Sequence, residues 1–168
     1  MLLVRLAVGE ASVQATGTMP SPEIGSPAPD FTLEGTGPDG PRSYTLSAER
    51  GHPVVLAFYP GDDTHTCTKQ LCSYQDSLSR FTELEAVVWG ISGQDLASHQ
   101  RFAAKRGLTF PLLADPDHTV LRRYGVRAPM RTKRSVFVVD GDGALRWKHV
   151  SALGLTYVDV DEIAAAIR

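Results

Sequence analysis

The clearest hydrophobic run in the chain covers residues 54–59, where no charged residue interrupts the aliphatic and aromatic side chains. Such a run predicts a strand that is buried on both faces. Pro60 and Gly61 end it, because proline cannot donate to a neighbouring strand and glycine permits a turn. Beyond the turn, apolar residues are spaced three and four apart, which predicts an amphipathic helix over residues 66–84. The apolar positions of this helix are Leu71, Tyr74, Leu78 and Phe81.

The rest of the chain alternates between further short apolar runs and helical periods. Strands are predicted at residues 31–33, 43–46, 86–92, 136–139 and 144–150, the first two as a hairpin and the last two around a turn at 140–143. Helices are predicted at residues 95–106, between Asp115 or Asp117 and Gly125, and at 160–168. Gly107 ends the first of these helices, and Asp159 with Glu162 forms a capping box for the last.

This order of elements, β-α-β-α followed by a hairpin and a helix, predicts the fold class. We expect an α/β protein with a thioredoxin-like fold, in which helices flank a central mixed β-sheet and a β-hairpin lies at the N-terminal side. A chain of 168 residues suits one hydrophobic core. We therefore expect a single domain over residues 23–168, preceded by a tail of residues 1–22.

The tail leaves three interpretations open. Its first eight residues are apolar except for Arg5, but the run is far too short to span a bilayer, and no basic region precedes it. Residues 13–15 loosely resemble a cleavage site, so a weak signal peptide is one interpretation. A disordered or strand-like tail is the second, and translation from Met19 is the third.

The net charge and the number of cysteines argue against some classes of protein and favour others. The formal net charge is −2, which implies no general attraction to nucleic acid or to an anionic membrane. Two cysteines five residues apart are too few for a disulfide scaffold and suit a redox or metal pair in a reducing compartment. We expect a cytoplasmic protein with neither a nucleic-acid nor a membrane partner.

The predicted position of Cys67 suits a reactive thiolate. It lies in the first turn of the helix that follows a buried strand, where open α/β sheets place their chemistry. A free thiol is mostly protonated at pH 7, and making the thiolate dominant requires about 3 kcal/mol. The helix dipole supplies about 0.3–1 kcal/mol, or up to about 2 in a sheltered site. A cation from elsewhere in the chain, for which we expect an arginine, must supply the rest.

Several segments resemble the peroxiredoxins. Pro60, Thr64 and Cys67 stand in the spacing P-x-x-x-T-x-x-C, which matches the active-site signature of that family. The surrounding residues and the second cysteine, Cys72, resemble its bacterioferritin-comigratory-protein branch, also called Q-type. Segments near residues 24–31, 110–117 and 134–140 are similar to other parts of that branch, so the resemblance covers about residues 24–150.

The resemblance implies roles for individual residues. Cys67 would be the peroxidatic cysteine and Cys72 the resolving cysteine. Pro60 would shield the site, Thr64 would hydrogen-bond sulfur and peroxide, and Arg134 would be the cation.

Four positions depart from the family pattern. Glutamine replaces the usual glutamate at Gln70, so that side chain can hydrogen-bond but brings no charge. The other departures are His65, Thr66 and Val136.

Other interpretations of the same residues stay open. Cys72 could simply be a buried residue of the hydrophobic core. Residues five apart on a helix lie roughly 100°–140° apart around its axis, so Cys72 need not face Cys67. Arg127 and Arg131 are weaker candidates for the site cation. A zinc site built on His65, both cysteines and His99 or His149 fits no common finger spacing.

We therefore expect a thiol-dependent peroxidase that reduces hydrogen peroxide and alkyl hydroperoxides. The oxidised Cys67 would form an intrachain disulfide with Cys72, which thioredoxin or a similar dithiol would reduce. No cofactor or metal is expected, and the protein is expected to be a monomer or weak homodimer. The rival hypotheses are a one-cysteine peroxidase resolved by an external thiol and a redox sensor without turnover.

Overall fold

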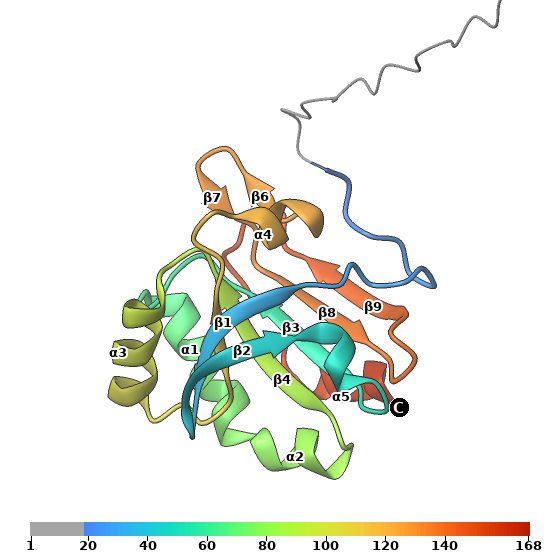
Figure 1. Ribbon diagram of the computed structural model, residues 1–168, viewed down its shortest axis with the longest axis horizontal. Coiled ribbons are helices and arrows are strands. Elements are labelled where there is room, and N and C mark those ends of the chain that lie inside the picture. The colour runs from blue at the N-terminus through green and yellow to red at the C-terminus, as the bar shows by residue number, and fades with distance from the viewer. Residues whose placement is uncertain (1–18) are drawn as a thin grey trace, which may run out of the picture.

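A computed structural model describes residues 19–168 (Figure 1). The signal-peptide and tail interpretations fall largely on residues 1–18, which lie outside the described residues. The strands are β1 (Thr32–Gly37), β2 (Gly40–Thr45), β3 (Val54–Phe58), β4 (Val87–Ser92), β5 (Leu112–Ala114), β6 (Arg127–Ala128), β7 (Arg131–Thr132), β8 (Ser135–Val139) and β9 (Leu145–Val150). The helices are the 3₁₀ turn η1 (Leu46–Glu49) and the α-helices α1 (His65–Asp76), α2 (Leu78–Glu83), α3 (Leu96–Arg106), α4 (Thr119–Arg123) and α5 (Val160–Ile167).

Seven strands form one mixed sheet in the order β2-β1-β5-β4-β3-β8-β9. The central strand β3 runs parallel to β4 and antiparallel to β8, and β4 runs parallel to β5. The strands β6 and β7 form a separate small ribbon. Helices lie on both sides of the large sheet (Figure 1), which confirms the predicted thioredoxin-like α/β fold with its N-terminal hairpin.

The side chains of β3 alternate between two hydrophobic cores. Val55 and Ala57 face a core that includes residues of α1, α2, α3 and α5. Val54, Leu56 and Phe58 face the opposite core, which includes residues of η1 and α4. All five side chains are buried, as expected for a central strand that is covered on both faces. The carboxyl end of β3 is therefore fixed from both sides.

The single helix predicted over residues 66–84 is wrong in its extent. It is divided into α1 and α2 at Ser77, whose φ of −109° and ψ of 18° lie outside the helical range. Serine competes with helix geometry through its own local hydrogen bonds, so a break at this residue costs little. The predicted apolar face continues from α1 to α2, because Tyr74 and Phe81 pack edge to face with their ring centroids 6.3 Å apart.

The N-terminal hairpin is longer than the sequence pattern indicated. The first strand was predicted to end at residue 33, but Gly35 and Gly37 also lie in β1, and only two residues separate β1 from β2. A Cβ atom added to Gly35 or Gly37 would lie within 3.0 Å of the Tyr44 side chain. The two glycines therefore make room for an aromatic ring on the neighbouring strand.

Strand β5 was missed because three buried residues are too few to show a period. Residues 19–22 are also described, and Lys148 Nζ donates to the carbonyl of Pro22 at 2.7 Å. Within the described part of the chain, none of the helices is both long and apolar enough to cross a membrane.

Candidate active site

Cys67 is the third residue of α1 and is fully buried at the end of β3. The first turn of a helix presents backbone N–H groups without intrahelical partners, and these favour a negative charge. Thr64 occupies the N-cap position in an extended conformation, but its side chain makes no capping hydrogen bond. Its hydroxyl donates to the carbonyl of Gly61 at 3.1 Å.

The cation beside Cys67 is Arg134. Its Nη2 lies 3.3 Å from Cys67 Sγ, and its Nη1 donates to Gln70 Oε1 at 2.5 Å. Sheet register explains the meeting, because Ser135 at the start of β8 pairs with Phe58 at the end of β3. Strand β8, the antiparallel partner of β3, thus places Arg134 next to the connection between β3 and α1.

Arg134 is only 4% exposed, yet it forms no ion pair with a carboxylate in the part of the chain that the structure describes. Its third contact is a hydrogen bond from Nε to the carbonyl of Gly154 at 3.2 Å. A buried guanidinium held only by neutral acceptors favours a nearby anion. The Cys67 sulfur is the group in contact that can become that anion.

Gln70 links this arginine to a second buried residue. Gln70 Nε2 donates to the Tyr74 hydroxyl at 3.1 Å, and that hydroxyl donates to the carbonyl of Val158 at 2.9 Å. Burial raises the pKa of Tyr74 well above the ordinary value, so the phenol keeps its proton. Gly154 and Val158 both belong to the connection between β9 and α5, which therefore closes over the arginine.

Cys72 lies in α1 five residues after Cys67 and is half-buried, and both thiols are free. Two Cα atoms five residues apart on an intact helix are separated by roughly 8.5–9 Å. A disulfide tolerates at most about 7 Å between them. The two cysteines therefore cannot bond while this part of α1 stays helical.

The other predicted site residues occupy different positions. Pro60 is exposed beside the loop that leads into α1. Arg127 lies half-buried in β6, and the exposed Arg131 donates to backbone carbonyls of residues 152 and 153. Of the three arginines considered from the sequence, Arg134 is the one that contacts Cys67.

The zinc interpretation finds no support in residues 19–168, where no three metal-ligating side chains gather. The two ring nitrogens of His99 lie at 2.7 Å from Asp62 Oδ2 and 3.1 Å from the carbonyl of Leu113.

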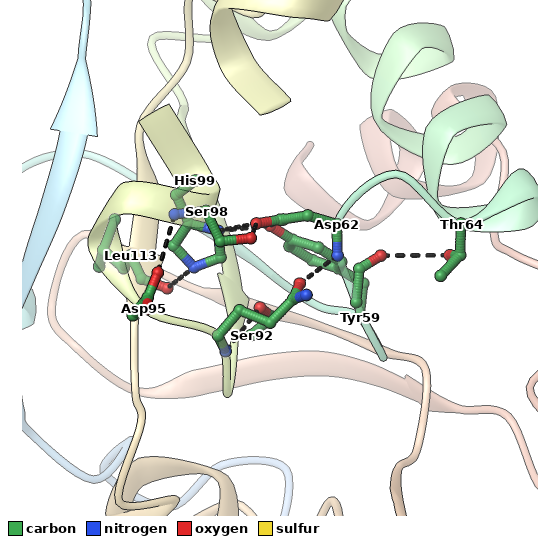
Figure 2. A network of polar contacts seen from close by, with 10 residues as sticks. Tyr59, Asp62, Thr64, Ser92, Asp95, Ser98, His99 and Leu113 are labelled. Carbon is green, nitrogen blue, oxygen red and sulfur yellow. Dashed lines mark hydrogen bonds and ion pairs between the residues drawn. The ribbon is translucent and has the colours of Figure 1, made fainter. Parts of the chain in front are cut away.

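Sequence reasoning missed a buried polar cluster around Asp62 (Figure 2). Asp62 was not among the predicted site residues, but its carboxylate accepts from the hydroxyls of Tyr59 and Ser98 and faces His99. Burial alone would raise the pKa of Asp62, but the hydrogen bond and the charge of His99 lower it below the ordinary value. A polar residue in the turn that follows a buried strand was the available signal. Nothing in the sequence paired it with a histidine 37 residues away.

Comparisons with known proteins agree with this geometry. Residues 24–148 match the model of the AhpC/TSA family. A peroxiredoxin Q described as chloroplastic, from Oryza sativa subsp. japonica, is 43% identical over 126 residues, which are 73% of this chain and 57% of that protein. The chain thus spans little more than half the length of such plant relatives. A putative peroxiredoxin bcp from Coxiella burnetii is 36% identical over 142 residues, covering 79% of this chain and 92% of that protein.

Among solved structures, the peroxidoxin BcpB of Mycobacterium tuberculosis superposes with a TM-score of 0.77 at 32% identity. The match covers 86% of this chain and 96% of that one. The family suggested by the residues around Cys67 is thereby confirmed. The chain belongs to the AhpC/TSA family and, within it, to the peroxiredoxins of the Q and bcp type.

Proposed function

We propose that this protein is a thiol-dependent peroxidase that reduces hydrogen peroxide and alkyl hydroperoxides through Cys67. The observation that carries the proposal is the 3.3 Å contact between Arg134 Nη2 and Cys67 Sγ. A buried cation that pairs with no carboxylate of residues 19–168, at the N-terminal end of a helix, is an arrangement that stabilises a thiolate nucleophile.

In the first step the Cys67 thiolate attacks the distal oxygen of the hydroperoxide. The O–O bond breaks, Cys67 becomes a sulfenic acid, and the departing oxygen takes a proton to leave as water or an alcohol. Arg134 and the free amides of the first turn of α1 stabilise the charge that develops on the oxygens. The Thr64 hydroxyl donates its own proton to Gly61, so its lone pairs can accept from the peroxide O–H. Pro60 shields the loop side of the site.

In the second step the Cys72 thiol condenses with the sulfenic acid, which forms a disulfide and releases water. The helical spacing of the two residues requires α1 to unwind locally first. An external dithiol, for which we propose thioredoxin, then reduces the bond by thiol–disulfide exchange. A reducing compartment such as the cytoplasm would supply this reductant, and the cycle uses only the two sulfur atoms of this chain.

The test is peroxide-dependent turnover with reduced thioredoxin in excess over enzyme. We expect many turnovers for the wild type and none for Cys67→Ser, a nearly isosteric change that leaves the fold intact. A single stoichiometric oxidation of the wild type would instead identify a redox sensor.

The matched variant Cys72→Ser separates the two peroxidase mechanisms. We expect it to show no turnover with thioredoxin as the reductant, so that peroxide consumption ends once Cys67 itself is oxidised. Undiminished turnover in Cys72→Ser would show that an external thiol resolves Cys67.

A further inference from the structure

The loop between β3 and α1 is anchored by the buried cluster around Asp62 (Figure 2). Asp62 Oδ1 accepts from the Tyr59 hydroxyl at 2.6 Å, and Oδ2 accepts from the Ser98 hydroxyl at 2.7 Å. Oδ2 also lies 2.7 Å from His99 Nδ1, and the backbone N–H of Asp62 donates to the Gln94 side chain. Tyr59 directly follows β3, Gln94 lies in the turn after β4, and Ser98 and His99 belong to α3. The carboxylate and the backbone N–H of Asp62 together therefore join three parts of the chain directly ahead of the reactive helix.

The contacts of His99 fix the orientation of its ring. Nδ1 lies 2.7 Å from the Asp62 carboxylate and 3.3 Å from the Tyr59 hydroxyl, and Nε2 lies 3.1 Å from the carbonyl oxygen of Leu113. A carboxylate oxygen can only accept, so the contact with Asp62 needs a proton on Nδ1. His99 and Asp62, whose side chains are 0% and 4% exposed, therefore form a buried hydrogen-bonded pair.

This pair lies where α1 lacks local support. The Thr64 side chain does not cap the helix, and the first turn contains no acidic residue. Cys67 follows Asp62 by five residues, and Cys67 shares a core with Tyr59. The position of the first turn therefore depends on how firmly Asp62 is held.

We propose that Asp62 and His99 are positioning residues for the reaction of Cys67. Their hydrogen bond holds the loop and the first turn of α1 in the folded arrangement in which Cys67 attacks peroxide. Loss of the pair favours the unwound arrangement in which Cys67 can reach Cys72. This inference rests on the proposed peroxidase function.

The pair then sets the fate of the sulfenic acid. In the unwound arrangement the Cys72 thiol attacks the sulfenic sulfur, and water leaves as the disulfide forms. In the folded arrangement the sulfur of the Cys67 sulfenate attacks a second hydroperoxide. That O–O bond breaks, an alcohol or water leaves, and a sulfinic acid remains. A tight Asp62–His99 contact therefore favours fast attack on the first peroxide and also makes the enzyme more sensitive to excess peroxide.

The test compares Asp62→Asn and His99→Asn with the wild type by intact mass after exposure to graded hydrogen peroxide. We expect both variants to require at least fivefold more peroxide than the wild type for half-conversion of Cys67 to the sulfinic acid. The rate of disulfide formation should rise in both variants. The double variant should match the single variants, because the two residues act as one unit.

The matched control is Asp63→Asn. Asp63 is the next residue along the chain and also binds α3, but through exposed ion pairs with Lys105 and Arg106. Asparagine tolerates its φ of 58°, so the backbone should be kept. We expect its sulfinic conversion to stay within twofold of the wild type. If Asp62→Asn and His99→Asn divided between disulfide and sulfinic acid in the same ratio as the wild type, the proposal would be overturned.

Amide hydrogen exchange on the reduced proteins separates positioning from general stability. Residues 62–69 should lose protection in both variants, while β3 and β8 keep theirs. If protection were lost throughout the domain while the ratio of disulfide to sulfinic acid stayed unchanged, the pair would have a structural role only.

Nitrogen NMR of the wild-type histidines needs neither a variant nor peroxide. It should find a proton on Nδ1 of His99 that is hydrogen-bonded to Asp62, and an Nδ1 without that proton would overturn the proposal even if neither variant folds. An absence of turnover together with this hydrogen bond and the local exchange effect would refute the peroxidase function while leaving the anchoring role intact.

Discussion

The helices α1 and α3 pack into the same core, but they begin in different ways. At the start of α3, the Asp95 side chain accepts from the backbone N–H of Ser98 at 2.8 Å. Its end is also stabilised locally, because Gly107 adopts a left-handed conformation with a φ of 65° and two basic residues lie in the last turn. The sequence around α3 therefore specifies both of its ends.

The start of α1 has none of these local features. Thr64 makes no capping hydrogen bond, and the first turn holds a cysteine in place of an acidic residue. Distant contacts stabilise this turn, with Arg134 on the sulfur and Asp62 bound to α3. Local caps suit a helix that stays fixed throughout a reaction cycle. Tertiary contacts suit a turn that must form for one step and open for the next.

The largest contrast between the two helices should appear on oxidation. Because the Cys67–Cys72 bond cannot span an intact helix, residues 66–71 should lose about 100-fold or more in hydrogen-exchange protection in the disulfide state. The capped helix α3 should keep its protection. Mass spectrometry must confirm the disulfide in the same sample. Equal protection of residues 66–71 in both states would contradict the unwinding step.

Removing the distant cation should cause the next largest effect. Arg134→Ala takes away the charge that faces the Cys67 sulfur and leaves the Gln70 and Gly154 oxygens without their donor. We expect peroxide reduction to slow by about 100-fold, the range expected for one electrostatic donor. Alkylation of Cys67 should require a higher pH. Arg134→Lys should recover part of the rate, because it keeps the charge.

The control for this prediction is Arg131→Ala. Arg131 is exposed and also binds the backbone of the connection after β9, but it does not contact the cysteine. It should leave both the rate and the alkylation profile unchanged. If the two arginine variants behaved alike, Arg134 would act by holding the connection between β9 and α5 in place and not through its charge beside the Cys67 sulfur.

The same contrast explains what could be predicted from the sequence. The ends of α3 and the capping box of α5 were predicted because Asp95, Gly107 and Asp159 act within a few residues of themselves. The break at Ser77 was missed because the apolar period continues across it. The Asp62–His99 pair was missed because it spans 37 residues and depends on how α3 packs. Arg134 could be assigned to the site only through family resemblance, since sheet register brings it there.

A smaller effect should follow from Gln70→Glu. Gln70 holds the guanidinium of Arg134 through a neutral oxygen at 2.5 Å. A carboxylate there would compete with the Cys67 thiolate for the same cation and would repel it in a buried site. We expect peroxide reduction to slow by about two- to tenfold, with Cys67 alkylation moved to higher pH by less than about one unit.

Gln75→Glu is the matched control for the Gln70 variant. It lies on the same helix, where its Oε1 accepts from the backbone of Thr109, a contact that a carboxylate can keep. It should behave as the wild type. A faster reaction in Gln70→Glu would mean that orientation of the guanidinium matters more than its free charge.

The smallest effect should come from Asp95→Ala, which gives α3 the uncapped start that α1 already has. Loss of an N-cap aspartate lowers the free energy of unfolding by about 1 kcal/mol. The change should appear as a lower denaturation midpoint in urea with an unchanged slope. Peroxide reduction should stay within twofold of the wild type, because Asp95 contacts neither Cys67 nor the Asp62 carboxylate. A large loss of activity at full folding would show that the start of α3 also takes part in positioning the loop.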